Sequence, residues 1–211
     1  MSAVATHEQG RLCVFARVPE LGAVKTRLAQ GIGAERALRA HEQLVRGCLK
    51  QLADLQQLRV ELWVAGPVDH PGAVAWSAEW GLPLRSQRGA ELGARMADAM
   101  EQSLATAPFA IIVGTDCPTL SSDYVRQAVR ELAQHDLVLG PAEDGGYGLI
   151  GLRRPVPELF TEMPWGSKAV TAETLTRARQ QQLDVQLLST LWDVDTEADW
   201  QRFVALASSG A

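Results

Sequence analysis

Apolar residues recur along the chain with two different spacings, one typical of strands and the other of helices. Short apolar runs of strand length lie at residues 12–16, 59–65, 109–113, 136–139, 147–152 and 184–188. Between them, apolar positions repeat every three or four residues at 34–53, 91–105, 122–134, 169–182 and 196–207. Ser121 or Ser122, and Asp195 or Thr196, are suitable N-cap residues for two of these helices. Strands that alternate with helices predict an α/β fold.

The run FAIIV at residues 109–113 is apolar throughout, which is typical of a central strand covered by helices on both faces. The stretch LVLGPAEDGGYGLIGL breaks the alternation, because two strand-like runs flank a glycine-rich connection without a helix. We therefore expect a three-layer α/β/α fold with a mixed, mostly parallel sheet. Such sheets bind ligands beyond the carboxyl ends of their strands, so the loops after the strands should carry the chemistry.

The chain has 211 residues, of which 46% are hydrophobic, so we expect a single domain over residues 1–211 with a flexible segment at 1–10. No apolar run approaches the ~20 residues of a membrane span, and the first residues lack a secretion-signal pattern, which predicts a cytoplasmic protein. A net charge of −5 argues against a nucleic-acid surface. Three scattered cysteines suggest neither a disulfide framework nor a zinc site. We expect a small-molecule partner, and the oligomeric state stays open.

The loop after the first predicted strand contains Gly22, followed closely by Lys25 and Arg27. A glycine that lets backbone amides face an anion, next to two cations, suits a polyphosphate. The order of residues is not that of a P-loop, because GxxxxGK[ST] is absent. An ordinary solvated basic loop explains these residues about as well.

Acidic residues follow two other predicted strands. Asp116 comes after the run 109–113 and is fixed by Pro118, where it can bind Mg²⁺ or form a simple Asx turn, and the turn is the better explanation when the motif is taken alone. Asp193 and Asp195 occupy alternate positions, which suits a shared cation. They also suit a helix N-terminus, where the helix dipole favours acids.

The segment between the two antiparallel runs places Glu143 and Asp144 before Gly145 and Gly146. Either acid can act as a base or hold hydroxyl groups, and the glycines permit close approach to a sugar or phosphate. Asp-Gly is equally a strong signal for a hairpin turn. Further along, Trp165 either stacks on a ligand ring or packs as an ordinary loop aromatic.

Six motifs occur in a fixed order over residues 11–203: FARVPELGAVKTRLA, QRGAELGARM, GTDCP, GPAEDGGYGLIGL, PWGS and DVDT. As a set they resemble the small GT-A-like family of candidate glycosyltransferases first described as a domain of unknown function, DUF2064. The VKTRL loop and the DVDT ending are also similar to 2-phospho-L-lactate guanylyltransferase and other nucleotidyltransferases. The resemblance implies a nucleotide-diphospho-sugar transferase fold. Relatives commonly carry two aromatics after the glycine pair, whereas here Tyr147 precedes Gly148.

The resemblance also implies a site. Mg²⁺ or Mn²⁺ would be held on the phosphates of a nucleotide by Asp116, Asp193 and Asp195, and a cation would relieve the mutual repulsion of these acids. Lys25 and Arg27 would neutralise the same phosphates. Further contacts to the nucleotide are expected from Gly22, Gln87, Gly89, Arg95, Thr115, Gly145 and Gly146.

Together these features predict a metal-dependent transferase that uses a nucleotide-activated donor, and a glycosyltransferase acting on a nucleotide-sugar is the preferred form. Its catalytic residues would be Lys25, Arg27, Asp116 and Asp144. A nucleotidyltransferase of the guanylyl or cytidylyl type, releasing pyrophosphate, would use nearly the same residues. A non-catalytic nucleotide-binding domain is the third hypothesis.

Overall fold

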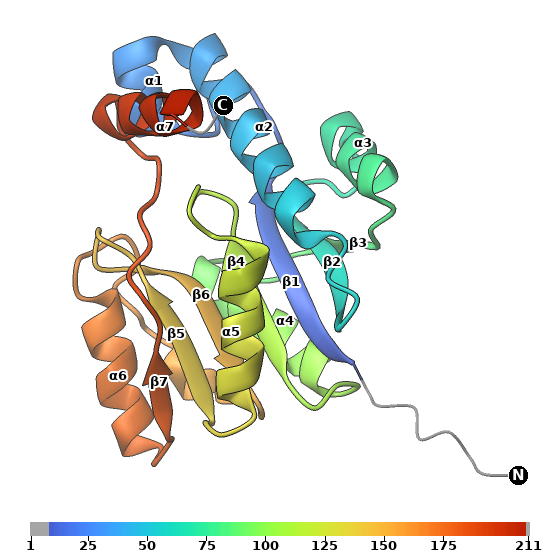
Figure 1. The fold of residues 1–211 in the computed structure, drawn as a ribbon, viewed down its shortest axis with the longest axis vertical. Coiled ribbons are helices and arrows are strands. Elements are labelled where there is room, and N and C mark those ends of the chain that lie inside the picture. Colours follow the sequence, from blue (N-terminus) through green and yellow to red (C-terminus); the bar gives the residue numbers. More distant parts are fainter. Residues whose placement is uncertain (1–8, 210–211) are drawn as a thin grey trace, which may run out of the picture.

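One seven-stranded sheet organises the computed structural model, which describes residues 9–209 (Figure 1). Its strands are β1 (Gly10–Arg17), β2 (Leu58–Ala65), β3 (Leu84–Ser86), β4 (Ala110–Gly114), β5 (Leu137–Pro141), β6 (Tyr147–Leu152) and β7 (Val185–Leu187). The helices are α1 (Thr26–Ile32), α2 (Ala34–Leu52), α3 (Pro71–Trp80), α4 (Leu92–Leu104), α5 (Ser122–Leu132), α6 (Val170–Gln180) and α7 (Glu197–Ser209), with the 3-10 helix η1 (Pro157–Leu159).

The strand order places a switch point in the middle of the sheet. The order is β3-β2-β1-β4-β6-β5-β7, in which β6 runs antiparallel to β4 and β5 and the other neighbours are parallel. This confirms the mixed, mostly parallel sheet and the antiparallel pair predicted around the glycine-rich turn. From β1 the chain continues to β2 on one side, and β4 lies on the other. The loops after β1 and β4 therefore diverge and leave a crevice at their carboxyl ends.

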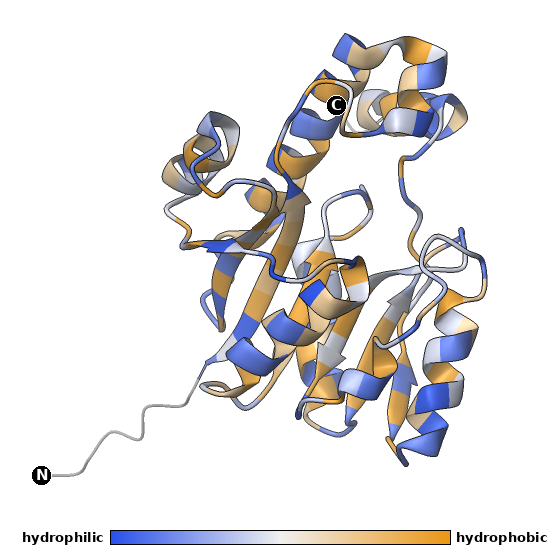
Figure 2. Cartoon of the chain, turned by 180° about the vertical axis from the view of Figure 1, so that it is seen from behind, coloured by the Kyte–Doolittle hydropathy of each residue, from blue (hydrophilic) through white to orange (hydrophobic). Residues whose placement is uncertain are grey.

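Alternate residues of the central strands face two separate cores, which makes the fold three-layered (Figure 2). Leu12 and Val14 of β1 pack with residues of α2, α3 and α5 on one face of the sheet. Cys13 and Phe15 pack with residues of α4, η1 and α6 on the other face. A third cluster joins α1 and α2 to Trp192 and Val194, just before α7. The predicted α/β/α arrangement is thus confirmed.

Among residues 9–209, two α-helices and the short 3-10 helix η1 were not predicted. α1 has seven residues, which is too short for an apolar period to be recognised, and it lies inside the segment expected to be a loop. α3 carries apolar side chains around most of its circumference, so it lacks a polar face. Its beginning is nevertheless well defined, because Pro71 is its first residue and Nδ1 of His70 accepts a hydrogen bond from the amide of Gly72 (3.1 Å).

The expected N-cap residues are found at both helices for which they were named. Ser121 Oγ accepts a hydrogen bond from the amide of Tyr124 (3.2 Å) at the start of α5. Before α7, Asp199 accepts from the amide of Thr196 (2.7 Å), and the Thr196 hydroxyl accepts from the amide of Asp199 (3.4 Å). The last helix therefore begins with a reciprocal cap, directly after the DVDT motif.

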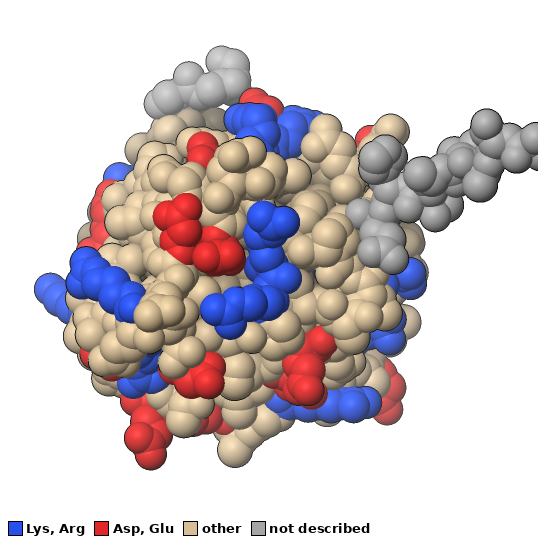
Figure 3. All heavy atoms as spheres, turned by 90° about the horizontal axis from the view of Figure 1, so that it is seen from below, with Lys and Arg blue, Asp and Glu red and all other residues tan. Residues whose placement is uncertain are grey.

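The flexible segment expected at residues 1–10 lies outside the described residues up to position 8, and Gly10 already begins β1. No helix among residues 9–209 is both long and apolar enough to cross a membrane. At the end of the molecule where β1 begins, acidic and basic side chains lie close together without a broad patch of one sign (Figure 3). This face offers no extended cationic surface to a polyanion.

Candidate active site

Lys25 and Asp116 meet at the switch point of the sheet. Phe15 of β1 is paired with Gly114 of β4, so the loops that follow these two strands begin side by side. Lys25 Nζ lies 2.8 Å from Asp116 Oδ1 and donates a hydrogen bond to the carbonyl of Val194 (2.7 Å). The Lys25 side chain is only 5% exposed, whereas that of Asp116 is 48% exposed. A buried ammonium thus holds a carboxylate that still faces solvent.

The backbone of Lys25 adopts an unusual conformation to reach this position. Its φ angle is +48°, in the left-handed region that residues with a side chain seldom occupy. Such a conformation costs on the order of 1 kcal/mol and persists where its surroundings fix it. Here the contacts to Asp116 and Val194 fix the side chain, so the loop is built around the position of this ammonium.

The segment between β7 and α7 runs from the sheet to α7, which lies beside α1 (Figure 1). The amide of Val194 donates to the carbonyl of Asp116 (3.0 Å), which joins this segment to the loop after β4. Asp195 Oδ2 receives a hydrogen bond from Arg27 (2.8 Å), and this hydrogen bond raises the pKa of the arginine. Asp193 instead faces the crevice. The two acids of the DVDT motif therefore point to different partners.

Asp193 lines a cavity together with Asp116 and Asp144, and we call these three residues the acidic rim. The cavity has a volume of about 300 Å³. Burial, with the charge of Asp144 as the second cause, raises the pKa of Asp193 to about 6. The acidic rim therefore gathers carboxylates from three loops, and Lys25 is bonded to Asp116.

The oxygen atoms of Asp116 and Asp193 suit a hard divalent cation. Within residues 9–209, no group of three or more His, Cys, Asp or Glu side chains is close enough to hold a metal ion. Mg²⁺ in transferases is commonly held by one or two carboxylates, with phosphate oxygens and water completing its shell. Asp116 and Asp193 line the same cavity and are the two acids that could hold such an ion there, whereas Asp195 contacts Arg27 rather than the cavity.

The turn between β5 and β6 separates the roles of its two acids. Glu143 accepts two hydrogen bonds from Arg202 (2.8 and 3.1 Å), and these bonds lower the pKa of the Glu143 carboxyl. The guanidinium of Arg202 also lies over the ring of Trp192, 4.2 Å from its centroid. Asp144 instead lines the cavity, where its Oδ1 accepts from the amide of Gly146 (2.8 Å). Of the two candidate bases, only Asp144 faces the cavity.

Gly145 and Gly146 have different structural roles in this turn. Gly145 has φ +91°, and a side chain there would begin 2.3 Å from the carbonyl oxygen of Lys168. Gly146 lines the cavity, and its carbonyl accepts a hydrogen bond from the hydroxyl of Thr171 (2.6 Å). The hairpin interpretation of this motif is therefore correct, and it is compatible with a site because the same turn places Asp144.

The residues expected to contact the nucleotide lie on several sides of the crevice. Arg95 lines an open hollow of about 240 Å³ beside the loops after β1 and β2, and its Nε donates to the carbonyl of Gly89 (3.0 Å). Gln87 donates to the carbonyls at the ends of β1 and β2, so it braces the two strands. Gly22 lies in the first loop with φ +79°. Thr115 is buried next to a smaller hollow beside α2.

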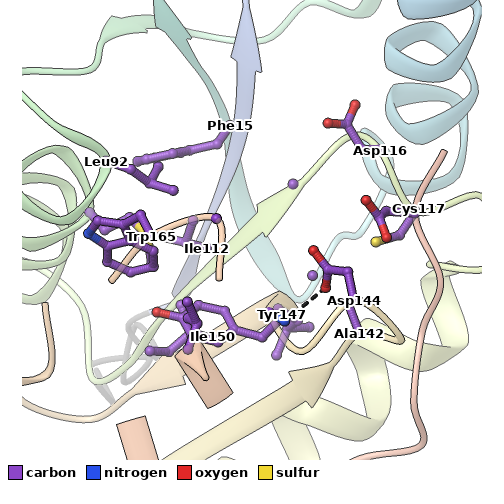
Figure 4. Close-up of a pocket in the computed structure, with 18 of the residues that line it drawn as sticks. Phe15, Leu92, Ile112, Asp116, Cys117, Ala142, Asp144, Tyr147, Ile150 and Trp165 are labelled. Carbon is purple, nitrogen blue, oxygen red and sulfur yellow. Dashed lines mark hydrogen bonds between the residues drawn. The ribbon is translucent and has the colours of Figure 1, made fainter. Parts of the chain in front are cut away.

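Large apolar side chains form the opposite side of the cavity from the acidic rim (Figure 4). We call this set the apolar wall: Phe15, Leu92, Met96, Ile112, Ile150 and Trp165. In Figure 4 the indole nitrogen of Trp165 lies on the side away from Asp116 and Asp144, so its six-membered ring faces the cavity. Of this set the sequence indicated only Trp165, because the other residues follow the ordinary pattern of core positions in strands and helices.

Gly148 explains the absence of a second aromatic after the glycine pair. A Cβ atom at this position would lie 2.7 Å from Sγ of Cys117 and 2.8 Å from a methyl group of Leu191. Cys117 is buried and free, as are Cys13 and Cys48. The glycine therefore allows Cys117 and Leu191 to pack closely against this strand, at a position that also lines the cavity.

The fold and the arrangement of its loops are those of a nucleotide-diphospho-sugar transferase-like protein. The chain belongs to the family described as "Uncharacterized protein conserved in bacteria" (DUF2064), whose profile matches residues 48–167. A candidate nucleotide-diphospho-sugar transferase from Desulfovibrio desulfuricans G20 is 31% identical and superimposes with a TM-score of 0.82, over 90% of this chain and 83% of that one.

More distant structures share the fold alone. The CMP:2-keto-3-deoxy-manno-octonic acid synthetase, in a complex with CTP, is 14% identical with a TM-score of 0.61, over 96% of this chain and all of the other. Glucosyl-3-phosphoglycerate synthase from Mycobacterium tuberculosis, in a complex with Mn²⁺, UDP and glucosyl-3-phosphoglycerate, is 11% identical with a TM-score of 0.54, over 87% and 71% of the two chains. No curated protein sequence matches the chain significantly.

Proposed function

We propose that the protein is a metal-dependent glycosyltransferase that uses a nucleotide-sugar. The observation that carries this proposal is the contact between Lys25 and Asp116 at the switch point, with Asp193 on the same cavity. A buried cation and two carboxylates at the carboxyl ends of parallel strands can bind the phosphates of a nucleotide with a divalent ion. The open hollow that contains Arg95, beside the loops after β1 and β2, is the space we assign to the nucleoside.

Leaving-group stabilisation is the role we assign to the charged residues of the first loop. When the donor bond breaks, negative charge develops on the departing nucleoside diphosphate, and a positioned ammonium stabilises that charge. Lys25 is placed for this role because its side chain is buried and bonded at the mouth of the cavity. Arg27 adds an exposed positive charge nearby. A bound Mg²⁺ or Mn²⁺ would supply further charge neutralisation at Asp116 and Asp193.

Proton transfer is the role we assign to Asp144. A hydroxyl oxygen of the acceptor forms the new bond to the anomeric carbon, while the bond from that carbon to the diphosphate oxygen breaks. The hydroxyl proton passes to a carboxylate oxygen of Asp144, whose orientation is fixed by the amide of Gly146. Glu143 is occupied by Arg202 and takes no part in this step.

Nucleotidyl transfer is the second candidate, because distant structures with this fold include a synthetase bound to CTP. In that reaction an acceptor phosphate attacks the α-phosphate of a nucleoside triphosphate, and pyrophosphate leaves. The same charged residues would serve. We prefer glycosyl transfer because, within the described chain, the cavity is lined by acids and by no Lys, Arg or His, which disfavours an anionic acceptor.

The test is to incubate the purified protein with Mn²⁺ and a panel of nucleotide-sugars or nucleoside triphosphates, and to measure the released nucleotides and pyrophosphate. Release of nucleoside diphosphate that requires an acceptor supports the proposal. Pyrophosphate from a triphosphate would favour nucleotidyl transfer, and nucleotide binding without either product would favour a binding domain.

A variant at Asp116 tests the site itself. Asp116→Asn should abolish Mn²⁺-dependent binding of nucleoside diphosphates, measured by titration calorimetry. Asp54→Asn is the matched control, because Asp54 is exposed in the turn after α2 and lines none of the hollows described above. Unchanged binding by Asp116→Asn would rule out this location for the metal and its nucleotide.

A further inference from the structure

The cavity next to the charged residues is divided into two chemically different halves. The acidic rim occupies one side, and the apolar wall occupies the other (Figure 4). Four residues of the apolar wall are buried and belong to the central sheet or α4, so this part of the wall is rigid: Phe15, Met96, Ile112 and Ile150. Leu92 is 43% exposed and lies at the opening. An exposed leucine at the mouth of an apolar hollow is available to a ligand.

Trp165 completes the apolar wall from a loop. Its ring meets that of Tyr147 edge to face, with centroids 6.2 Å apart and an interplanar angle of 78°. Gly93 of α4 makes room for it, because a Cβ there would lie 2.8 Å from the indole Nε1. The indole is therefore held between a strand and a helix. The six-membered ring of the indole lines the cavity as an apolar surface.

The charge of the cavity limits what can bind against this wall. Within the described chain its lining contains the three acids of the rim and no Lys, Arg or His. Lys25 does not line the cavity, and its ammonium is bonded to Asp116 on the side of the first loop. A phosphate or carboxylate on the acceptor would face like charges in a partly buried site, whereas a hydroxyl group can donate a hydrogen bond to Asp144.

From this arrangement we infer that the acceptor is a neutral molecule with a flat apolar body, such as an aromatic ring, that ends in a hydroxyl group. The apolar body lies between Trp165, Phe15 and Leu92, and the hydroxyl reaches Asp144. The inference rests on the proposed function, because it names the substrate class of the same site. It excludes a sugar phosphate or another anionic acceptor.

Binding without turnover tests the inference separately from the proposed function. The probes are 2-(2-naphthyl)ethanol and its phosphate monoester, which share the apolar body and differ in the charge of the end group. Ligand-observed NMR titrations with the full chain and a chelator present give both affinities. We expect the alcohol to bind at least about tenfold more tightly than the ester. Equal or tighter binding of the ester would overturn the inference, as would the absence of binding by both probes.

Two variants locate the binding in the cavity. Trp165→Ala removes the flat surface, and Leu92→Glu adds a charge at the opening without altering the buried core. Each should weaken binding of the alcohol by about tenfold. Leu206→Glu is the matched control for the second variant, because Leu206 is 52% exposed on α7 and does not line the cavity. An effect of Leu206→Glu equal to that of Leu92→Glu would contradict this location.

The acidic rim is tested by Asp144→Asn. Removing one negative charge should narrow the preference for the alcohol over the ester by about tenfold. An unchanged ratio would show that the rim does not select the acceptor, which would overturn the inference. The alcohol could bind as expected while no nucleotide-sugar is consumed in its presence. In that case the inference about the bound molecule holds, and the proposed glycosyl transfer is wrong.

Discussion

The acidic rim and the apolar wall face the same cavity, but they are held in place by different interactions. The rim depends on hydrogen bonds and one ion pair between segments far apart in the sequence, such as Lys25 with Asp116 and Val194 with Asp116. The wall depends on close packing of α4, the sheet and the Trp165 loop. Substitutions in the rim should therefore change ligand binding more than stability, and substitutions behind the wall should do the reverse.

Replacement of Lys25 should have the largest effect on ligand binding. Lys25→Met keeps most of the side-chain volume and removes the charge that would meet the phosphates. A charge-assisted contact of this kind corresponds to about 100-fold in affinity, so nucleoside diphosphate binding in the presence of Mn²⁺ should weaken by about that factor in titration calorimetry. Turnover should fall at least as much, since the same charge would stabilise the leaving group.

Lys50→Met is the control for this experiment, because Lys50 is exposed on the last turn of α2. It makes the same chemical change outside the site and should leave nucleotide affinity unchanged. If Lys25→Met bound nucleotides as wild type does, the ammonium would be a structural element of the loop only. The expectation that substitutions around the acidic rim change ligand binding more than stability would then lose its main support.

The packing behind the apolar wall should be sensitive to a single methyl group. In Gly93→Ala the added Cβ would lie 2.3 Å from the carbonyl oxygen of Phe160 and 2.8 Å from Nε1 of Trp165. Because backbone must move to make room, the free energy of unfolding should fall by about 1–3 kcal/mol in chemical denaturation.

Gly47→Ala makes the same change in another helix, and we expect it to raise the free energy of unfolding instead. Gly47 lies within α2 and is exposed, and a Cβ added there would have no atom of a neighbouring segment within 4 Å. Alanine is the better helix former, so this variant should gain about 0.5–1 kcal/mol. If Gly93→Ala and Gly47→Ala changed the free energy of unfolding equally, the Trp165 loop would move to accommodate a side chain on α4. The apolar wall would then not be a rigid surface.

A smaller effect on stability is expected at Asp193. The folded protein raises the pKa of Asp193 to about 6, so the native state binds this proton more tightly than the unfolded chain. The ionised carboxylate therefore lowers the free energy of unfolding above pH 6, and the penalty disappears as the pH falls below about 4. Asp193→Asn should stabilise the metal-free protein by about 1 kcal/mol at pH 8, after allowance for solvent screening of this half-buried group.

The measurement is chemical denaturation of both proteins at pH 4 and pH 8 with a chelator present. The difference between them should be seen at pH 8 and be absent at pH 4. We expect Mn²⁺ and nucleoside diphosphate together to raise the melting temperature of the wild type and not that of this variant. A variant that is less stable than wild type at pH 8 would show that the Asp193 carboxylate is stabilised, not destabilised, by its surroundings.

Most of the fold could be predicted from the sequence because it leaves local signals. The residues of the acidic rim were indicated by the resemblance of the ordered motifs, because each motif taken alone fits a turn or a helix cap as well. The apolar run before Asp116 and the glycine-rich turn before Tyr147 each indicate an element and the loop that follows it. The rule that ligands lie at strand ends then brings Lys25 and Asp116 to the same edge of the sheet. The sequence did not show in which direction each acidic side chain points. In the structure Asp193 faces the cavity, and Asp195 contacts Arg27.

The apolar wall could not be predicted in the same way. Phe15 and Met96 are apolar residues in a strand and a helix, and nothing local distinguishes a residue beside a cavity from one inside a filled core. Gly93 looks like an isolated helical glycine until Phe160 and Trp165, about seventy positions later, are packed against it. Such information arises only when the elements are assembled.

The smallest effect is expected at Glu143, the acid next to Asp144. Glu143→Gln keeps one hydrogen-bond acceptor for Arg202, whose guanidinium also remains over Trp192. The Glu143 pKa is lowered in the folded state, so its contribution to stability exists above its ordinary value near 4.5 and is lost as the pH falls. Because both partners are exposed to solvent, the melting temperature should change little at pH 7 and not at all in acid.

Turnover of Glu143→Gln should stay within about twofold of wild type, whereas Asp144→Asn should lose about 100-fold. Equal losses in the two variants would mean that the turn between β5 and β6 acts through its shape, and Asp144 would not be the base.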